Sequence, residues 1–153
     1  MPSAPASLAE VAALARPVIE RIVWCTVATV SPAGEPRTRL MHPVWRWDGE
    51  VPTAFVTART TSLKLRHLAA NPRVSCLYWD PTHDTVAIDA DATWLDLEAR
   101  RAAWDVIAAE PPPIGFDPAA IWPDGPTAAD CGILRFTARR IVATPAGQPG
   151  LRW

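Results

Sequence analysis

The segment from residue 57 to residue 66 combines hydroxyl groups and cations with the predicted start of a helix. It reads Thr57-Ala-Arg-Thr-Thr-Ser-Leu-Lys-Leu-Arg66, so three hydroxyl residues stand between a strand and a helix. The first N–H groups of a helix lack partners within it and bind anions, and hydroxyls add donors. Arg59, Lys64 and Arg66 bring three cations there, although the helix dipole disfavours a cation at this end by roughly 0.3–1 kcal/mol. This pattern predicts either a phosphate-like anion site or an ordinary Thr/Ser helix cap with solvated cations.

A second pair of cations lies on the strand predicted before this segment. Arg37 and Arg39 are two residues apart, so their side chains share one face of a strand. Two arginines on one strand face indicate recognition of an anion, because a guanidinium binds phosphate or carboxylate through two parallel hydrogen bonds. The alternative is a solvent-exposed edge strand that its charges protect from aggregation.

The elements that position these residues follow from periodicity and turn signals. Ser7 begins a capping box, and apolar residues at helical spacing continue to Ile22, although Pro17 is expected to kink or split this helix. Asp96 is predicted to cap a later helix. Strands are predicted at about 22–30, 36–47, 53–57, 74–79, 86–94, 132–136 and 140–144, and a further helix at 60–70. The strands form hairpin-like runs, which favours an α+β, mainly β fold with an antiparallel sheet or small barrel.

Composition bounds the classes of partner. The 153 residues predict one domain spanning 1–153, and fifteen basic against sixteen acidic side chains give a net charge of -1. This balance argues against nucleic acid or an anionic membrane as a partner. No apolar stretch approaches the ~18 residues of a membrane helix, and no secretory signal is expected. Cys25, Cys76 and Cys131 are expected to be separate buried thiols, which fits a cytoplasmic protein.

The remaining side chains that could do chemistry give weaker signals. His42, His67 and His83 show no metal-ligand spacing, and each is expected to be a polar surface or turn residue. No metal site is predicted. Trp24, Trp94 and Trp104 are predicted to be core residues, because they fall on apolar faces. Residues 114–130 form a predicted irregular loop carrying Trp122, and loops of this kind often cover a site.

The order of these features resembles the pyridoxamine 5'-phosphate oxidase-like, FMN-binding split-barrel superfamily. The resemblance covers residues 8 to 145, and its most specific part is Ser62-Leu-Lys64, followed seven residues later by Asn71-Pro72 and a Tyr-Trp pair. The other matching segments are Thr26-Val-Ala-Thr-Val30, Ser31-Pro-Ala-Gly-Glu-Pro36, Arg37-Thr-Arg39, Asp48-Gly49, Phe55-Val-Thr57 and Leu68-Ala-Ala-Asn-Pro72.

The resemblance implies a split β-barrel, antiparallel and of Greek-key type, with flanking helices. It also implies a homodimer that binds FMN at the interface between the subunits. The phosphate of FMN would be held by Arg39, Thr61, Ser62 and Lys64, with Arg37 on the same strand face. The segment that would line the flavin ring consists of Phe55, Val56, Thr57 and Ala58.

The implied activity is that of a flavin-dependent oxidoreductase that transfers hydride to or from a small organic substrate. The family's Ser-Arg-Lys element reads Ser62-Leu-Lys64 here, so Arg59 or Arg66 would have to supply the missing cation. The chain ends Gly150-Leu-Arg-Trp153, without the C-terminal Arg-x-His element of the oxidase itself. A deazaflavin-dependent reductase and a non-catalytic flavin- or haem-binding module remain alternatives. Catalytic residues are not identified, and His42 is the candidate acid or base by its position.

Overall fold

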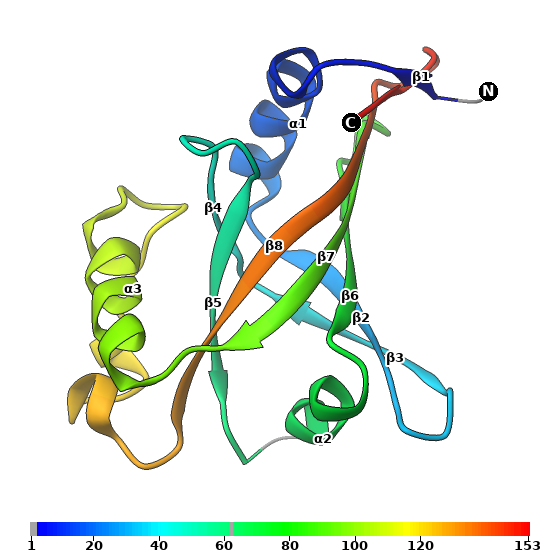
Figure 1. Cartoon of the computed structure of the whole chain (residues 1–153). Helices are drawn as coiled ribbons and strands as arrows, with labels where there is room; N and C mark the ends of the chain where they lie inside the picture. The colour runs from blue at the N-terminus through cyan, green and yellow to red at the C-terminus, as the bar shows by residue number, and fades with distance from the viewer. Residues whose placement is uncertain (1–2, 62) are drawn as a thin grey trace.

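The computed structural model describes residues 3–61 and 63–153, and strands dominate it (Figure 1). The strands follow the order β1-β9-β8-β7-β6-β2-β3, and β4 and β5 join this sheet through the pairing of β5 with β8. The helices are α1 (Leu8–Ile22), α2 (Leu63–Ala70) and α3 (Leu97–Ala109). The strands are β1 (Ala4–Pro5), β2 (Cys25–Val30), β3 (Pro36–Met41), β4 (Val44–Arg46), β5 (Thr53–Arg59), β6 (Arg73–Trp79), β7 (Thr85–Trp94), β8 (Cys131–Thr144) and β9 (Leu151–Arg152).

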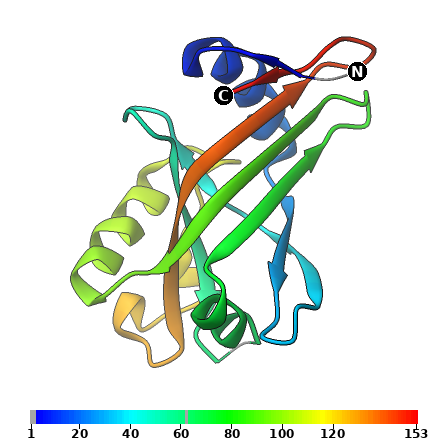
Figure 2. The same ribbon diagram turned by 45° about the vertical axis from the view of Figure 1, so that its right-hand side comes forward.

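This architecture confirms the expected α+β split-barrel fold, mainly β with flanking helices. All strand pairs between β2 and β8 are antiparallel, whereas the short strands β1 and β9 pair in parallel. The sheet is not a closed barrel. Helices α1 and α2 lie at opposite ends of it in both ribbon views (Figure 2). In the part of the chain that is described, no helix is long and apolar enough to span a bilayer.

Strand β8 connects the two halves of the sheet, running diagonally across the molecule in Figure 1. It pairs with β5 along its first half and with β7 along most of its length. The prediction of two strands at 132–136 and 140–144 was therefore wrong. A β-bulge joins the two segments, since Asp89 pairs with Arg140 but Ala90 pairs with Ala138, which leaves Arg139 as the extra residue.

Helix α1 begins at the predicted cap and ends at Ile22, the last residue of the predicted apolar pattern. Both hydrogen bonds of the capping box between Ser7 and Glu10 are present. The helix runs through Pro17 to Ile22 without a break, so of the two expected effects, a kink or a split, the split does not occur. Four apolar residues on both sides of this position form one buried face, and their burial outweighs the loss of one backbone hydrogen bond at Pro17. The Arg21 guanidinium also donates to the carbonyl of Pro17. The buried residues are Val11, Ala15, Val18 and Ile19.

A tight turn at Val23 converts the end of α1 into β2. Val23 has φ 66° and ψ -59°, and the N–H of Trp24 donates to the carbonyl of Ile22 at 2.7 Å, which is the geometry of a γ-turn. This backbone conformation is strained for a β-branched residue. The turn leaves Trp24 55% exposed, so the prediction that it belongs to the core was wrong.

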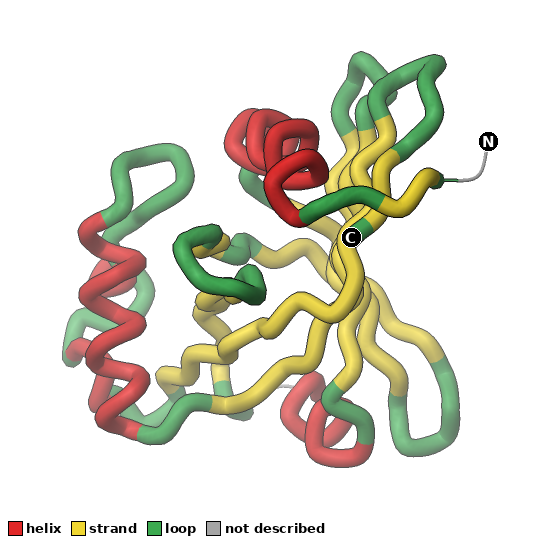
Figure 3. Tube along the Cα trace, turned by 45° about the horizontal axis from the view of Figure 1, so that its top comes forward, coloured by secondary structure: helices red, strands yellow, loops and turns green. Residues whose placement is uncertain are grey.

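The core lies between the strands and helix α1. The strand predicted at 86–94 is confirmed as β7, and its alternate residues Val86, Ile88, Ala90 and Ala92 are buried. All three cysteines are free and buried, as expected. Helix α3 covers a second, smaller cluster with Val44 and Ile133, and this helix lies away from α1 and α2 (Figure 3).

Gly132 permits the close approach of β8 to β5 and to the ring of Trp94. A Cβ atom at this position would lie 2.5 Å from Cζ3 of Trp94 and 2.8 Å from the carbonyl oxygen of Ala58. The carbonyl cannot move without disturbing the β5–β8 pairing, which places the end of β5.

We expect Gly132→Ala to lower the free energy of unfolding by roughly 1–3 kcal/mol, the usual cost of overpacking. Denaturant titration of both proteins measures this difference. Gly49→Ala is the matched control, because a Cβ there meets its nearest neighbour, the carbonyl oxygen of Val51, at an ordinary 3.5 Å. Equal stability of the two variants would contradict the close approach.

Candidate functional site

The two predicted cation segments meet at one pocket, which we call the Arg39–Lys64 pocket. Its volume is about 460 Å³. Its walls come from β3, β5, the start of α2 and the loop between α3 and β8; the lining residues are Trp24, Arg39, Leu40, Met41, His42, Thr57, Ala58, Arg59, Lys64, Phe116, Ile121 and Trp122. One part of the wall is cationic and the rest is largely apolar and aromatic.

Arg39 and Lys64 form the cationic part of the wall. Among the described residues, neither side chain has an ion pair with a carboxylate. Burial lowers the pKa of Arg39 below its usual value. The pKa of Lys64 is also lowered, first by burial and then by the positive charge of Arg39. Two partly buried like charges disfavour each other, so this wall is suited to bind an anion.

Arg59 lies at the rim of the same pocket and holds the covering loop. Its guanidinium forms an ion pair with Asp130 and lies over the ring of Trp122, 5.6 Å from the ring centroid. The indole N–H of Trp122 donates to Asp130 at 3.0 Å. Hydrogen bonds from Arg59, and to a lesser degree from Trp122, lower the pKa of Asp130. The loop carrying Trp122 therefore does reach the predicted site.

His42 lies between two aromatic rings on the apolar side of the pocket. Its ring centroid is 5.2 Å from that of Trp24 and 5.0 Å from that of Phe116. Burial lowers the pKa of His42, which favours the neutral imidazole. Nε2 lies 2.8 Å from the carbonyl oxygen of Ile114, so Nε2 carries the proton and Nδ1 remains an acceptor.

The structure brings together four of the nine cofactor-binding residues predicted from the sequence: Arg39, Thr57, Ala58 and Lys64. Four others do not line this pocket. Arg37 pairs with Glu35 at 2.7 Å, Phe55 packs toward α3, Val56 is in the core and Thr61 is exposed. Ser62 lies outside the described residues.

Sequence reasoning did not assign several aromatic and apolar residues of this pocket to the site. Phe116 and Ile121 come from the loop after α3, and only the irregular composition of that loop indicated a covering role. Trp24 reaches the pocket through the turn at Val23, for which the apolar pattern around it gave no signal. Leu40 and Met41 were visible only as neighbours of Arg39 on the same strand.

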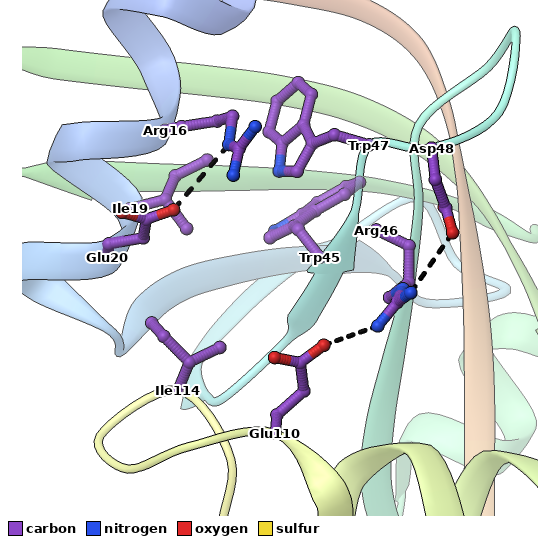
Figure 4. Close-up of a pocket in the computed structure, with 9 residues that line it drawn as sticks. All are labelled: Arg16, Ile19, Glu20, Trp45, Arg46, Trp47, Asp48, Glu110 and Ile114. Atoms are coloured by element: carbon purple, nitrogen blue, oxygen red, sulfur yellow. Dashed lines mark hydrogen bonds and ion pairs between the residues drawn. The ribbon is translucent and has the colours of Figure 1, made fainter.

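A second pocket lies between α1 and β4, and its arginine side chains, unlike Arg39, form ion pairs with carboxylates (Figure 4). Its volume is about 370 Å³, and Trp45 and Trp47 form one wall. Arg16 pairs with Glu20 at 3.6 Å. Arg46 pairs with both Asp48 and Glu110, and these contacts raise the pKa of Arg46 above its usual value. Each guanidinium of this pocket thus has a carboxylate partner, unlike Arg39.

Metal binding has no support in residues 3–61 and 63–153. No group of three His, Cys, Asp or Glu side chains there could hold a metal ion. The groups in the Arg39–Lys64 pocket that could contact a ligand are therefore cations, an imidazole and aromatic rings.

Several proteins of known structure share the fold of this chain. A Clostridium acetobutylicum protein related to general stress protein 26 of Bacillus subtilis (pyridoxinephosphate oxidase family) has a TM-score of 0.70 at 17% identity, covering 90% of this chain and 89% of its own. A pyridoxamine 5'-phosphate oxidase-related, FMN binding protein from Nostoc punctiforme has a TM-score of 0.63 at 16% identity, covering 95% and 86%. A NimC/NimA family protein from Clostridium acetobutylicum reaches 0.70 at 12% identity, covering 94% and 92%.

Comparison of sequences gives the family. No curated protein matches the chain. A family model described as pyridoxamine 5'-phosphate oxidase matches residues 12–144, which include every strand and helix that lines the Arg39–Lys64 pocket. The chain therefore belongs to the pyridoxamine 5'-phosphate oxidase family.

Proposed function

We propose that this protein binds FMN in the Arg39–Lys64 pocket and acts as a flavin-dependent oxidoreductase on a small organic substrate. The observation that carries the proposal is the pair of cations without a carboxylate partner among the described residues. A phosphate monoester has close to two negative charges at pH 7 and three acceptor oxygens. Such a phosphate would offset both the free-energy cost of burying these cations and their mutual repulsion.

The rest of the pocket suits the flavin ring. Thr57 and Ala58 line the pocket from β5, and their strand would present backbone groups to the polar edge of the ring. The aromatic side chains of Trp24, Phe116 and Trp122 provide surfaces for stacking. When bound, a flavin supplies the capacity for hydride transfer, while the protein orients the reactants and excludes water.

His42 is the residue that we propose to face the substrate. Its neutral imidazole carries the proton on Nε2, so Nδ1 can accept a hydrogen bond from a substrate N–H or O–H group. Arg59 is the residue that we propose to replace the cation missing from Ser62-Leu-Lys64, because it lines the pocket whereas the exposed Arg66 does not.

We also propose that the protein is a homodimer whose interface includes the outer face of β2, β3 and β6. Thr26 pairs with Leu40 on one side and with Leu77 on the other, so these three side chains form one row on the same face. Leu40 is 69% exposed, and Trp24 and Trp79 are exposed as well. Leu40 and Trp24 also line the pocket, so a second copy on this face would cover the bound cofactor.

Lys64 is the only lysine in the sequence, so selective labelling gives a single side-chain signal for the proposed phosphate site. We expect the ammonium group to titrate below its usual pKa of 10.5 in the ligand-free protein, because burial and Arg39 both disfavour its charge. Adding FMN or inorganic phosphate should shift the titration to higher pH. NMR of the lysine-labelled protein measures the titration midpoint without and with the added ligand. A midpoint that does not change when phosphate is added would contradict the proposed site.

We expect Lys64→Ala to weaken FMN binding roughly ten- to hundredfold, the usual effect of losing a charge-assisted hydrogen bond. Riboflavin lacks the phosphate, so its affinity should be nearly unchanged. Titration by flavin fluorescence quenching gives both dissociation constants. Arg66→Ala, on the same helix but outside the pocket, is the control. Equal losses for FMN and riboflavin would refute the assignment of Lys64 to the phosphate.

We expect Leu77→Glu to convert the dimer into a monomer, because it places a charge in the centre of the proposed interface. Leu77 does not line the pocket, so this change separates dimerisation from cofactor contacts. The control is Leu97→Glu, a similarly exposed leucine in the first turn of α3, where an acidic residue is favoured. Light scattering after size exclusion measures the mass, and a monomeric parent protein or a dimeric Leu77→Glu variant would refute the interface.

A further inference from the structure

The Arg39 side chain is hydrogen-bonded to a buried pair of polar side chains, the hydroxyl of Thr29 and the imidazole of His67. Its Nη1 donates to Oγ1 of Thr29 at 2.9 Å, and the same Oγ1 lies 3.1 Å from Nδ1 of His67. Thr29 and His67 are only 2% and 6% exposed, respectively. Buried polar side chains are normally hydrogen-bonded, and here the two groups satisfy each other and Arg39.

One direction in this chain of hydrogen bonds is fixed. A guanidinium can only donate, so Oγ1 of Thr29 is the acceptor toward Arg39. The hydroxyl of Thr29 can both donate and accept, so its hydrogen bond with Nδ1 of His67 forms with either neutral tautomer of the imidazole.

The Thr29 hydroxyl also joins the two elements that carry the pocket cations. Thr29 lies on β2 directly opposite Arg37 of β3, so Arg39 is its diagonal neighbour. His67 lies three residues after Lys64 on α2, so both residues share one side of that helix. Helix α2 packs on β2, with His67 and Leu68 as its buried residues.

This connection opposes the mutual repulsion of the cations. Arg39 is a long side chain that would otherwise turn toward solvent, away from the charge of Lys64. The β-branched side chain of Thr29 has few rotamers, and its burial restricts it further. Its hydroxyl therefore provides a rigid acceptor that keeps the guanidinium at the pocket wall.

We infer that Thr29 and His67 are positioning residues that hold Arg39 at a fixed separation from Lys64, and that they thereby determine the preference for a phosphorylated over an unphosphorylated ligand. The inference rests on the proposed binding of FMN in the Arg39–Lys64 pocket. Neither residue is expected to touch the cofactor, since neither lines the pocket.

The test is the ratio of riboflavin to FMN dissociation constants, measured by fluorescence quenching. Thr29→Val removes the hydroxyl and keeps the side-chain volume, so we expect it to reduce this ratio roughly tenfold, mainly by weakening FMN. Thr29→Ser retains the hydroxyl and should keep most of the preference. A purely structural role would instead weaken both ligands alike.

A second pair of variants tests the imidazole. His67→Asn keeps an amide group close to the position of Nδ1 that can accept or donate a hydrogen bond, whereas His67→Leu fills similar space without any hydrogen-bonding group. We expect the asparagine variant to keep most of the preference for FMN and the leucine variant to lose it. If Thr29→Val fails to fold, this pair decides the question by the same ratio.

The outcomes separate the inference from the proposed function. A parent protein that binds FMN and riboflavin equally well overturns the phosphate site itself, and the positioning role with it. A parent protein that prefers FMN, with Thr29→Val preferring it to the same degree, overturns only the positioning role. Equal ratios for His67→Asn and His67→Leu also overturn that role.

Discussion

The repulsion between Arg39 and Lys64 is the constraint on which the pocket depends. The two side chains approach each other from a strand and a helix, are partly buried and have no carboxylate partner among the residues that the structure describes. Burial and like charge both disfavour such a pair, so the fold must hold it in place. The pocket between α1 and β4 makes the contrast clear, because Arg16 and Arg46 are each paired with an acidic side chain there.

Other contacts of the fold hold the remaining walls of the pocket in place. Close packing at Gly132 sets the end of β5 against β8, and the turn at Val23 directs Trp24 onto the outer face. On the other side, the ion pair of Arg59 with Asp130 fixes the loop that brings Trp122 over the pocket. Strain at Val23 is thus a local cost that accompanies the placement of Trp24 at the pocket.

The sequence was sufficient to predict most of the helices and strands and to name four residues that line the candidate site, Arg39, Thr57, Ala58 and Lys64. Periodicity identified α1 and β7, because each has one face in the core, whereas the strand carrying Arg39 has only Met41 buried and was predicted from the turns on either side of it. Sequence pattern could not show that 132–136 and 140–144 are one strand, since the bulge at Arg139 interrupts the alternation that marks a strand. His67 was expected at the surface because its partner, Thr29, is 38 residues away, and only the packing of α2 on β2 brings them together.

The most direct test of the account is the position of the phosphorus atom in a crystal structure of the protein with FMN. We expect the phosphate between the guanidinium of Arg39 and the ammonium of Lys64, with the flavin ring extending along Thr57 and Ala58. A phosphate bound elsewhere, for example beside Arg16 and Arg46 in the pocket of Figure 4, would contradict it.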